Sequence, residues 1–243
     1  MAPMTAKASP RIVVLTGAGI SRESGLATFR EPGGVWDRVN LEDVATPEAF
    51  RRDPDFVHSF YNARRAQLTD GSVRPNAAHT ALARLARERH GEVLVITQNI
   101  DDLHDRAGQD PLIHMHGELL RAICTACRER RAWHGELTTE TPCPACGTAG
   151  TLRPDVVWFG EMPLDVERIL AALHACETFV AVGTSAAVQP AASFVHEARS
   201  AGARCVEVNL EPSEATPAFH DARHGPATEL VPTFVAELLG ERG

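Results

Sequence analysis

The chain of 243 residues is long enough for one sizeable domain, or for a domain with a smaller insertion, and 44% of its residues are hydrophobic. Its formal net charge of −8 argues against general nucleic-acid binding, which depends on neutralising phosphates. No apolar run approaches the roughly 20 residues of a membrane span, and the start MAPMTAKASP lacks the apolar core of a signal peptide. We therefore expect no nucleic-acid or membrane partner, a cytoplasmic location, and a disordered leader over residues 1–10.

Five apolar runs are typical of buried parallel strands: RIVVLT (11–16), EVLVIT (92–97), DVVWF (155–159), TFVAVG (178–183) and RCVEVN (204–209). Helical patterns lie between several of these runs or follow the last one, at residues 75–91, 163–176, 191–202 and 231–243. This alternation predicts a doubly wound, Rossmann-like α/β domain with a parallel sheet. We assign residues 11–27, 76–118 and 152–243 to this domain.

Two segments interrupt the alternation, and we interpret both as insertions that together build a smaller domain. The first, residues 28–75, contains loops and one helix. The second, residues 119–151, carries two C-x2-C pairs separated by fifteen residues, which are Cys124, Cys127, Cys143 and Cys146. Because four thiolates can hold zinc tetrahedrally and fill its coordination sphere, we predict one structural zinc ion. Iron and redox-active thiols are the alternatives.

The stretch HSFYNARRAQL (58–68) lies in the first insertion and has the pattern of a helix. Its expected limits are Asp53-Pro54 and Asp70-Gly71. At about 100° per residue, one apolar stripe of this helix contains Val57, Phe60, Tyr61 and Leu68, and Arg64 lies on the same stripe. Arg65 lies nearer the edge of the stripe, where we expect it to reach water. A buried guanidinium needs an anion or a wet cavity. Arg64 is therefore either a snorkelling or internally paired arginine, or it forms with Tyr61 a pocket for a ligand carboxylate.

Glycines follow the first strand, as in a turn that binds the phosphates of a dinucleotide. Gly17 and Gly19 fit that turn, but Arg22 occupies the third glycine position, so the fingerprint is incomplete and a plain tight turn stays open. A longer series of blocks is more specific: GAGISRESGLATFREPGGVW (17–36), TQNIDDLHDRAG (97–108), HMHGEL (114–119), the two C-x2-C pairs, VVWFGE (156–161), GTSAAVQPAA (183–192) and NLEPS (209–213). In this order they resemble the sirtuin family of NAD-dependent protein deacylases, from about residue 11 to the C-terminus. We expect a bacterial member.

The resemblance implies NAD as a co-substrate, bound by residues from four of these blocks (17–36, 97–108, 183–192 and 209–213) and by one residue near the C-terminus. The implied cofactor-binding residues are Gly17, Ala18, Gly19, Ser21, Thr28, Phe29, Arg30, Trp36, Gln98, Asn99, Ile100, Asp101, Gly183, Thr184, Ser185, Asn209, Glu211 and Ala227. Thr28, Phe29 and Arg30 belong to a loop that closes over the nicotinamide ribose in such enzymes. Asp101 also has a simpler interpretation as a helix cap.

The resemblance further implies that His116 acts as a general base on a ribose hydroxyl, a role suited to imidazole near neutral pH. We interpret the other histidines nearby, His79, His104 and His114, as structural. The substrate peptide is expected to lie as an extended strand along Val157, Trp158, Phe159 and Gly160. The products that the resemblance implies are nicotinamide, free lysine and O-acyl-ADP-ribose.

Sirtuins of the class III, desuccinylase type carry a Tyr-x-x-Arg pair in the acyl pocket, and Tyr61 and Arg64 match it. This favours removal of acidic acyl groups (succinyl and malonyl) from protein lysines, together with acetyl. The alternatives are an enzyme that is mainly a deacetylase, a mono-ADP-ribosyltransferase, and a non-enzymatic module with zinc knuckles. The expected partners are acyl-lysine proteins or peptides, NAD and nicotinamide, and a monomer is the default state.

Overall fold

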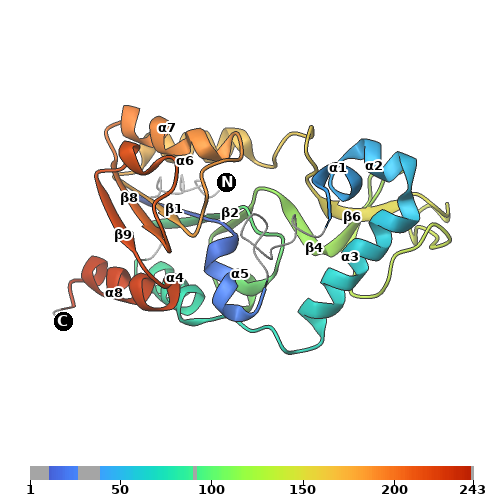
Figure 1. Ribbon diagram of the computed structural model, residues 1–243, viewed down its shortest axis with the longest axis horizontal. Helices are drawn as coiled ribbons and strands as arrows, with labels where there is room; N and C mark the ends of the chain where they lie inside the picture. The colour runs from blue at the N-terminus through green and yellow to red at the C-terminus, as the bar shows by residue number, and fades with distance from the viewer. Residues whose placement is uncertain (1–10, 27–38, 90–91, 242–243) are drawn as a thin grey trace, which may run out of the picture.

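The computed structural model describes residues 11–26, 39–89 and 92–241 (Figure 1). Its larger body is a six-stranded sheet in the order β3-β2-β1-β7-β8-β9, and every neighbouring pair is parallel. The strands are β1 (Ile12–Thr16), β2 (Val93–Thr97), β3 (Leu112–His114), β7 (Thr178–Val182), β8 (Arg204–Asn209) and β9 (Asp221–His224). The predicted parallel sheet is confirmed, and four of the five predicted strands belong to it.

Helices cover both faces of this sheet, as expected for a doubly wound fold. On one face lie α4 (Ala77–Glu88) and α8 (Ala227–Leu239), and on the other lie α6 (Val166–Ala175), the short 3-10 helix η2 (Ala191–Ser193) and α7 (Phe194–Ser200) (Figure 1). Successive side chains of β1 point alternately to the two helix layers. Val13 and Leu15 pack with α6 and α7, whereas Ile12 and Val14 pack with α4 and α8.

A second, antiparallel sheet has the order β5-β4-β6. Its strands are β4 (Gly117–Cys124), β5 (Arg130–Ala132) and β6 (Leu152–Val156). The prediction of a parallel strand over residues 155–159 is therefore wrong. That run is apolar because Val156 and Trp158 pack in a separate core. Burial alone does not distinguish such a segment from a central strand.

This separate core joins the second sheet to the helices of the first insertion, α1 (Leu41–Val44), α2 (Pro47–Arg52) and α3 (Pro54–Thr69). Leu119 of β4 lies in one hydrophobic cluster with Val57 and Tyr61 of α3. In Figure 1 these elements lie to the right of the parallel sheet. The residue limits that we assigned to the domains stay a prediction.

The limits predicted for the helix around Tyr61 are confirmed. Asp53 caps α3, since its side chain accepts a hydrogen bond from the Phe56 amide at 3.0 Å, and Asp70 is the C-cap residue. The remaining short elements are η1 (Ala18–Ser24), α5 (Leu103–Arg106) and η3 (Thr216–Ala218). In the described ranges, no helix combines the length and the apolar character that crossing a membrane requires.

The apolar face of α3 differs from the predicted stripe. Arg65 is 1% exposed, and its expected contact with water is wrong. Its Nε donates to the Leu119 carbonyl at 3.2 Å and its Nη1 to Asn62 Oδ1 at 2.8 Å. The face turned to the core thus runs through Val57, Tyr61, Arg65 and Leu68, which are all buried. Arg64 lies beside it and is half-buried.

Candidate active site

A large cavity, about 950 Å³, lies at the carboxyl ends of β1, β2, β7 and β8. Its volume is near the upper end of the roughly 300–1,000 Å³ of small-molecule sites. The chain reverses its direction of winding between β1 and β7, and a crevice at such a switch point is the usual ligand site of a doubly wound fold. The opposite wall is formed by α3 and by residues 156–161, which begin at the last residue of β6.

Glycines let the loops after β1 and β7 pack backbone against backbone. The Gly19 amide donates to the Gly183 carbonyl at 2.9 Å. A Cβ on Gly19 would lie 2.7 Å from Gly183 Cα, and Gly183 itself has φ +61°. Contact between these two loops by itself requires glycine at these positions, whether or not a phosphate also approaches them. Both loops line the cavity.

His116 stands between β3 and β4 and lines the same cavity. Its Nδ1 lies 3.0 Å from the Gln98 carbonyl oxygen, which can only accept, so Nδ1 carries the proton. Nε2 is then unprotonated in the neutral ring and able to accept a proton. Burial lowers the pKa of His116, against a smaller raising effect of the bond to Gln98. The ring is therefore neutral, and a competent base, near pH 7.

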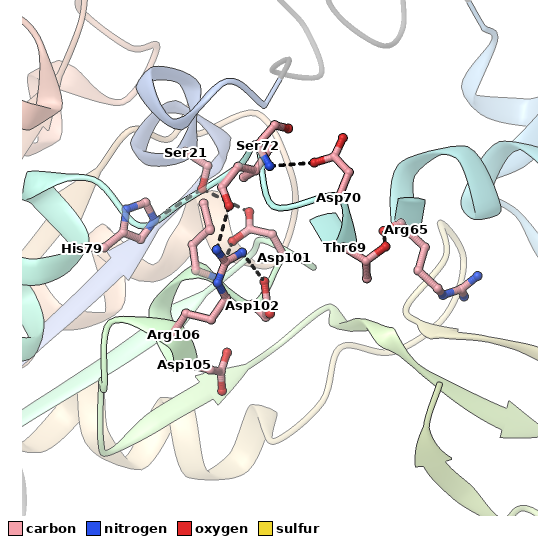
Figure 2. A network of polar contacts seen from close by, with 12 residues as sticks. Ser21, Arg65, Thr69, Asp70, Ser72, His79, Asp101, Asp102, Asp105 and Arg106 are labelled. Atoms are coloured by element: carbon pink, nitrogen blue, oxygen red, sulfur yellow. Dashed lines mark hydrogen bonds and ion pairs between the residues drawn. The ribbon is translucent and has the colours of Figure 1, made fainter. Parts of the chain in front are cut away.

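A buried polar cluster lies beside the main cavity, around a small cavity of about 20 Å³. Ser21 Oγ donates to Asp101 Oδ2 at 3.1 Å and accepts from Asn99 Nδ2 at 3.1 Å. Figure 2 shows Ser21, His79 and Asp101 converging from three segments of the chain. Burial raises the pKa of Asp101, and burial lowers the pKa of His79 to about 4. The three side chains are buried, so the cluster is shielded from water.

The histidines that we interpreted as structural make contacts within the protein. His79 completes a capping box at the start of α4, with Nδ1 3.0 Å from Asn76 Oδ1. His104 Nε2 lies 3.0 Å from Thr16 Oγ1. His114 forms an ion pair with Asp105 at 3.0 Å. Burial lowers the pKa of His114, but the hydrogen bond and charge of Asp105 outweigh it, and the net shift is upward.

Tyr61 and Arg64 line the main cavity together with His116. They stand three residues apart on α3, where side chains lie on neighbouring positions of one helix face. Tyr61 is buried, and burial raises its pKa to about 12, so its hydroxyl keeps its proton at neutral pH. Burial lowers the pKa of Arg64, but a guanidinium stays charged in proteins. The cavity therefore presents a cation and a hydroxyl at this wall.

The structure brings most of the predicted cofactor residues to the main cavity: Gly17, Ala18, Gly19, Gln98, Asn99, Ile100, Gly183, Thr184, Ser185, Asn209 and Glu211 line it. Two of these loops are tied together, because Gln98 Nε2 donates to Thr184 Oγ1 at 3.0 Å. Ser21 and Asp101 line the small cavity instead. Ala227 begins α8 and packs against the core, outside both linings. Thr28, Phe29, Arg30 and Trp36 lie outside the described residues, and all these roles stay predictions.

All four predicted peptide-contacting residues, Val157 to Gly160, line the cavity as well. The Val157 amide donates to the His116 carbonyl at 2.8 Å, which joins this segment to the candidate base. Other lining residues were not singled out from the sequence: Arg22, Phe60, Glu161, Val188, Gln189, Leu210, Pro212, Ser213 and Glu214. Most of these belong to or adjoin the quoted blocks. Phe60 precedes Tyr61 on α3 and would have been found by extending the Tyr-x-x-Arg pair.

The four cysteines of the second insertion form one cluster, with all Sγ atoms within 4.8 Å of one another. Cys124 and Cys146 Sγ are 3.8 Å apart, and Cys127 and Cys143 Sγ are 3.7 Å apart. Tetrahedral zinc with bonds of about 2.3 Å to sulfur requires separations of about 3.8 Å. The cluster therefore fits the predicted structural zinc, which would tie the ends of β4 and β6 together. It leaves no ligand position for chemistry on the metal.

Comparisons with known proteins agree with this geometry. The sequence profile of the Sir2 family matches residues 17–190. The chain is 53% identical over 230 residues to an NAD-dependent protein deacylase of Shigella flexneri, covering 95% of this chain and 84% of the relative. It is 50% identical over 229 residues to an NAD-dependent protein deacylase of Pasteurella multocida, covering 94% and 98%.

Solved structures give the same result. A Sir2 homologue in complex with NAD is similar with a TM-score of 0.84 and 38% identity, over 94% of this chain and 89% of the other. A Sir2 protein with a deacetylated p53 peptide and an acetyl ADP-ribose has a TM-score of 0.81 and 26% identity, over 95% and 94%. The chain belongs to the Sir2 family.

Proposed function

We propose that this chain is an NAD-dependent protein-lysine deacylase that prefers acidic acyl groups, succinyl and malonyl, and also removes acetyl. The deacylase activity is supported by membership of the Sir2 family and by bacterial relatives named NAD-dependent protein deacylase. The acyl preference is carried by one observation. Tyr61 and Arg64 line the same cavity as the candidate base His116.

NAD supplies a glycosidic carbon whose bond to nicotinamide can be broken. The protein's part is to hold the reacting groups and to move protons. The Gln98 carbonyl keeps the proton of the His116 ring on Nδ1. Nε2 is therefore unprotonated and can take a proton from a ribose hydroxyl. Asn99 and Asp101, buried around the small cavity, offer an amide and a carboxyl group to the carboxamide of nicotinamide. The zinc cluster takes no part in these steps.

The choice between acidic and uncharged acyl groups depends on electrostatic contacts of Arg64 and Tyr61, and not on the groups that break the bond to nicotinamide. A succinyl or malonyl group ends in a carboxylate, whereas an acetyl group needs apolar walls only. Arg64 can bind the carboxylate through a charge-assisted pair, and Tyr61 can add a hydroxyl donor. Because the guanidinium is half-buried, an anion beside it is screened less than on the open surface. The helix that carries both groups is fixed to the core by its buried face.

The test is a panel of matched acetyl, succinyl and malonyl peptides, with NAD, read by mass spectrometry. Arg64→Met keeps the apolar stem and removes the charge. It should lower kcat/KM for succinyl and malonyl peptides by an amount equivalent to about 2–5 kcal/mol, which is roughly 30-fold or more, and affect the acetyl peptide far less. An equal loss on all peptides would refute the acyl preference.

His116→Tyr serves as the matched control for the chemistry. It should abolish turnover of every peptide while the protein stays folded. Normal turnover by this variant would remove His116 from the mechanism. The same reactions with labelled NAD distinguish the transferase alternative, since label retained on a protein acceptor without free acyl-ADP-ribose would indicate ADP-ribosylation. Higher kcat/KM on acetyl than on succinyl peptide in the unmodified enzyme would indicate a deacetylase.

A further inference from the structure

The hydroxyl of Tyr61 is oriented by a buried indole. Trp158 is 2% exposed, and its Nε1 lies 3.0 Å from Tyr61 Oη. An indole nitrogen can only donate, so Tyr61 accepts this hydrogen bond. Its own proton must then point in another direction. Within the residues that the structure describes, that hydroxyl has no second hydrogen-bond partner, and Tyr61 lines the main cavity. The proton is therefore available to a ligand.

The indole is itself held by two charged residues. Arg153 of β6 places its guanidinium carbon 4.1 Å from the centroid of the Trp158 ring, a cation–π contact. Its Nη2 donates to both carboxylate oxygens of Glu161, at 2.9 and 3.1 Å. Glu161 Oε2 in turn accepts a hydrogen bond from the Trp158 amide at 2.9 Å. Ring face, ring nitrogen and backbone of Trp158 are thus each fixed by a different partner.

The position of this pair separates it from the residues that can touch the acyl group. The Arg153 side chain is only 14% exposed and does not line the main cavity. Glu161 does line it and is a negative charge on a wall that has to receive another negative charge. The ion pair with Arg153 neutralises that charge. Arg153 therefore has two effects: it fixes the Trp158 ring, and it neutralises the charge of Glu161.

We propose that Arg153 and Glu161 are positioning residues for acyl selection, which fix Trp158 so that Tyr61 presents its hydroxyl proton to the acyl carboxylate. This inference rests on the proposed preference for acidic acyl groups. Arg153 and Glu161 act through Trp158 and Tyr61, and they take no part in breaking the bond to nicotinamide.

The first measurement is the ratio of kcat/KM on matched succinyl and acetyl peptides, with zinc-loaded full-length enzyme and saturating NAD. Arg153→Met should lower this ratio about 5-fold or more, the worth of at least one hydrogen bond, mainly through a higher KM for the succinyl peptide. Arg153→Lys keeps a cation over the ring and beside Glu161, and should restore most of the ratio. In Arg153→Met the negative charge of Glu161 has lost its ion-pair partner. Adding Glu161→Gln removes that charge but keeps an acceptor for the Trp158 amide. This double variant should recover part of the loss.

A second measurement reports on Tyr61 without relying on turnover. Tyr61 is the chain's single tyrosine, so enzyme labelled with 3-fluorotyrosine gives one ¹⁹F resonance. Arg153→Met should shift this resonance in the free enzyme, and Arg153→Lys should shift it less. Thermal unfolding of each variant identifies any that fails to fold, in which case Arg153→Lys and Glu161→Gln carry the test.

The outcomes separate this inference from the function on which it rests. If the unmodified enzyme prefers the succinyl peptide and Arg64→Met removes that preference, the proposed function holds. If Arg153→Met then changes both peptides equally and leaves the ¹⁹F resonance in place, the positioning role is refuted alone. If the unmodified enzyme shows no preference, the proposed acyl selectivity fails and this role falls with it.

Discussion

Adjacent arginines on α3 are expected to have different functions, and exchanging each for methionine separates them. Arg65 is turned into the core, with hydrogen bonds to the Leu119 carbonyl and to Asn62 Oδ1. Figure 2 shows it pointing away from the polar cluster around Asp101. Arg64 lines both the main and the small cavity. We therefore expect Arg65→Met to lower stability and Arg64→Met to lower selectivity.

The size of the stability effect follows from the contacts of Arg65. Each hydrogen bond from a charged donor contributes about 1.5–3 kcal/mol. Burial opposes this, because it lowers the pKa of Arg65 to about 10 and so disfavours the charged form. Methionine keeps most of the apolar stem but leaves the buried Leu119 carbonyl without its donor. We expect a net loss of about 2 kcal/mol, which in a chain of this size lowers Tm by roughly 4–8 °C.

The assay is thermal unfolding by circular dichroism at pH 7, with zinc present, followed by the succinyl and acetyl peptides. Arg64→Met should leave Tm within about 2 °C, because its half-buried side chain faces the cavity. Arg65→Met should lower Tm while keeping the ratio of succinyl to acetyl turnover. The reverse pattern, with Tm lowered by Arg64→Met and selectivity lost in Arg65→Met, would refute the assignment.

Three further predictions concern the zinc cluster, the candidate base and the glycine contact. Cys143→Ser should abolish the one zinc per chain seen by elemental analysis and increase hydrogen exchange in β4 and β6; protection as in the unmodified protein would contradict a structural role. The acidic limb of the kcat/KM profile against pH should lie below the ordinary pKa of imidazole, because burial lowers that of His116 and keeps the base form present to lower pH; a limb above that value would count against it. Gly183→Ala would put a Cβ 2.4 Å from the Ile20 amide nitrogen at a positive φ, so we expect weaker NAD binding by calorimetry and a lower Tm, and unchanged values for both would disprove the contact.

The parallel sheet could be predicted because its central strands are long, apolar runs. β1, β2, β7 and β8 each have five or six residues, of which at least four are buried. The two edge strands were missed. β3 has three residues (LIH) and β9 has four (DARH), and neither offers enough apolar residues for a pattern to be recognised. Such strands form because a neighbouring strand provides hydrogen-bond partners, which a local pattern does not contain.

The arginine pair shows a different limit of sequence reasoning. A helical wheel places Arg64 and Arg65 on opposite borders of the stripe through Val57, Tyr61 and Leu68, and it does not say which border is buried. The choice is made by β4, whose Leu119 carbonyl receives the Arg65 guanidinium. That contact joins residues 54 positions apart in the sequence. Only the family's Tyr-x-x-Arg pair favoured a position of Arg64 at the cavity, where the structure places it. Its role toward the acyl group stays a proposal.

The candidate site depends on the core of the smaller body more closely than the motifs suggest. Tyr61 belongs to the buried cluster that holds α3 against β4 and β6, and it also lines the cavity. Trp158 belongs to the same cluster and also stands in the predicted peptide-binding segment. Tyr61 and Trp158 therefore have little freedom to move, because their side chains fill this core. His116 is fixed from the other body, through Gln98 after β2. The Tyr61 side chain is thus fixed mainly by the core of the smaller body and the His116 ring by the loop after β2, so we expect a change of acyl preference at α3 to leave the orientation of the His116 ring unchanged.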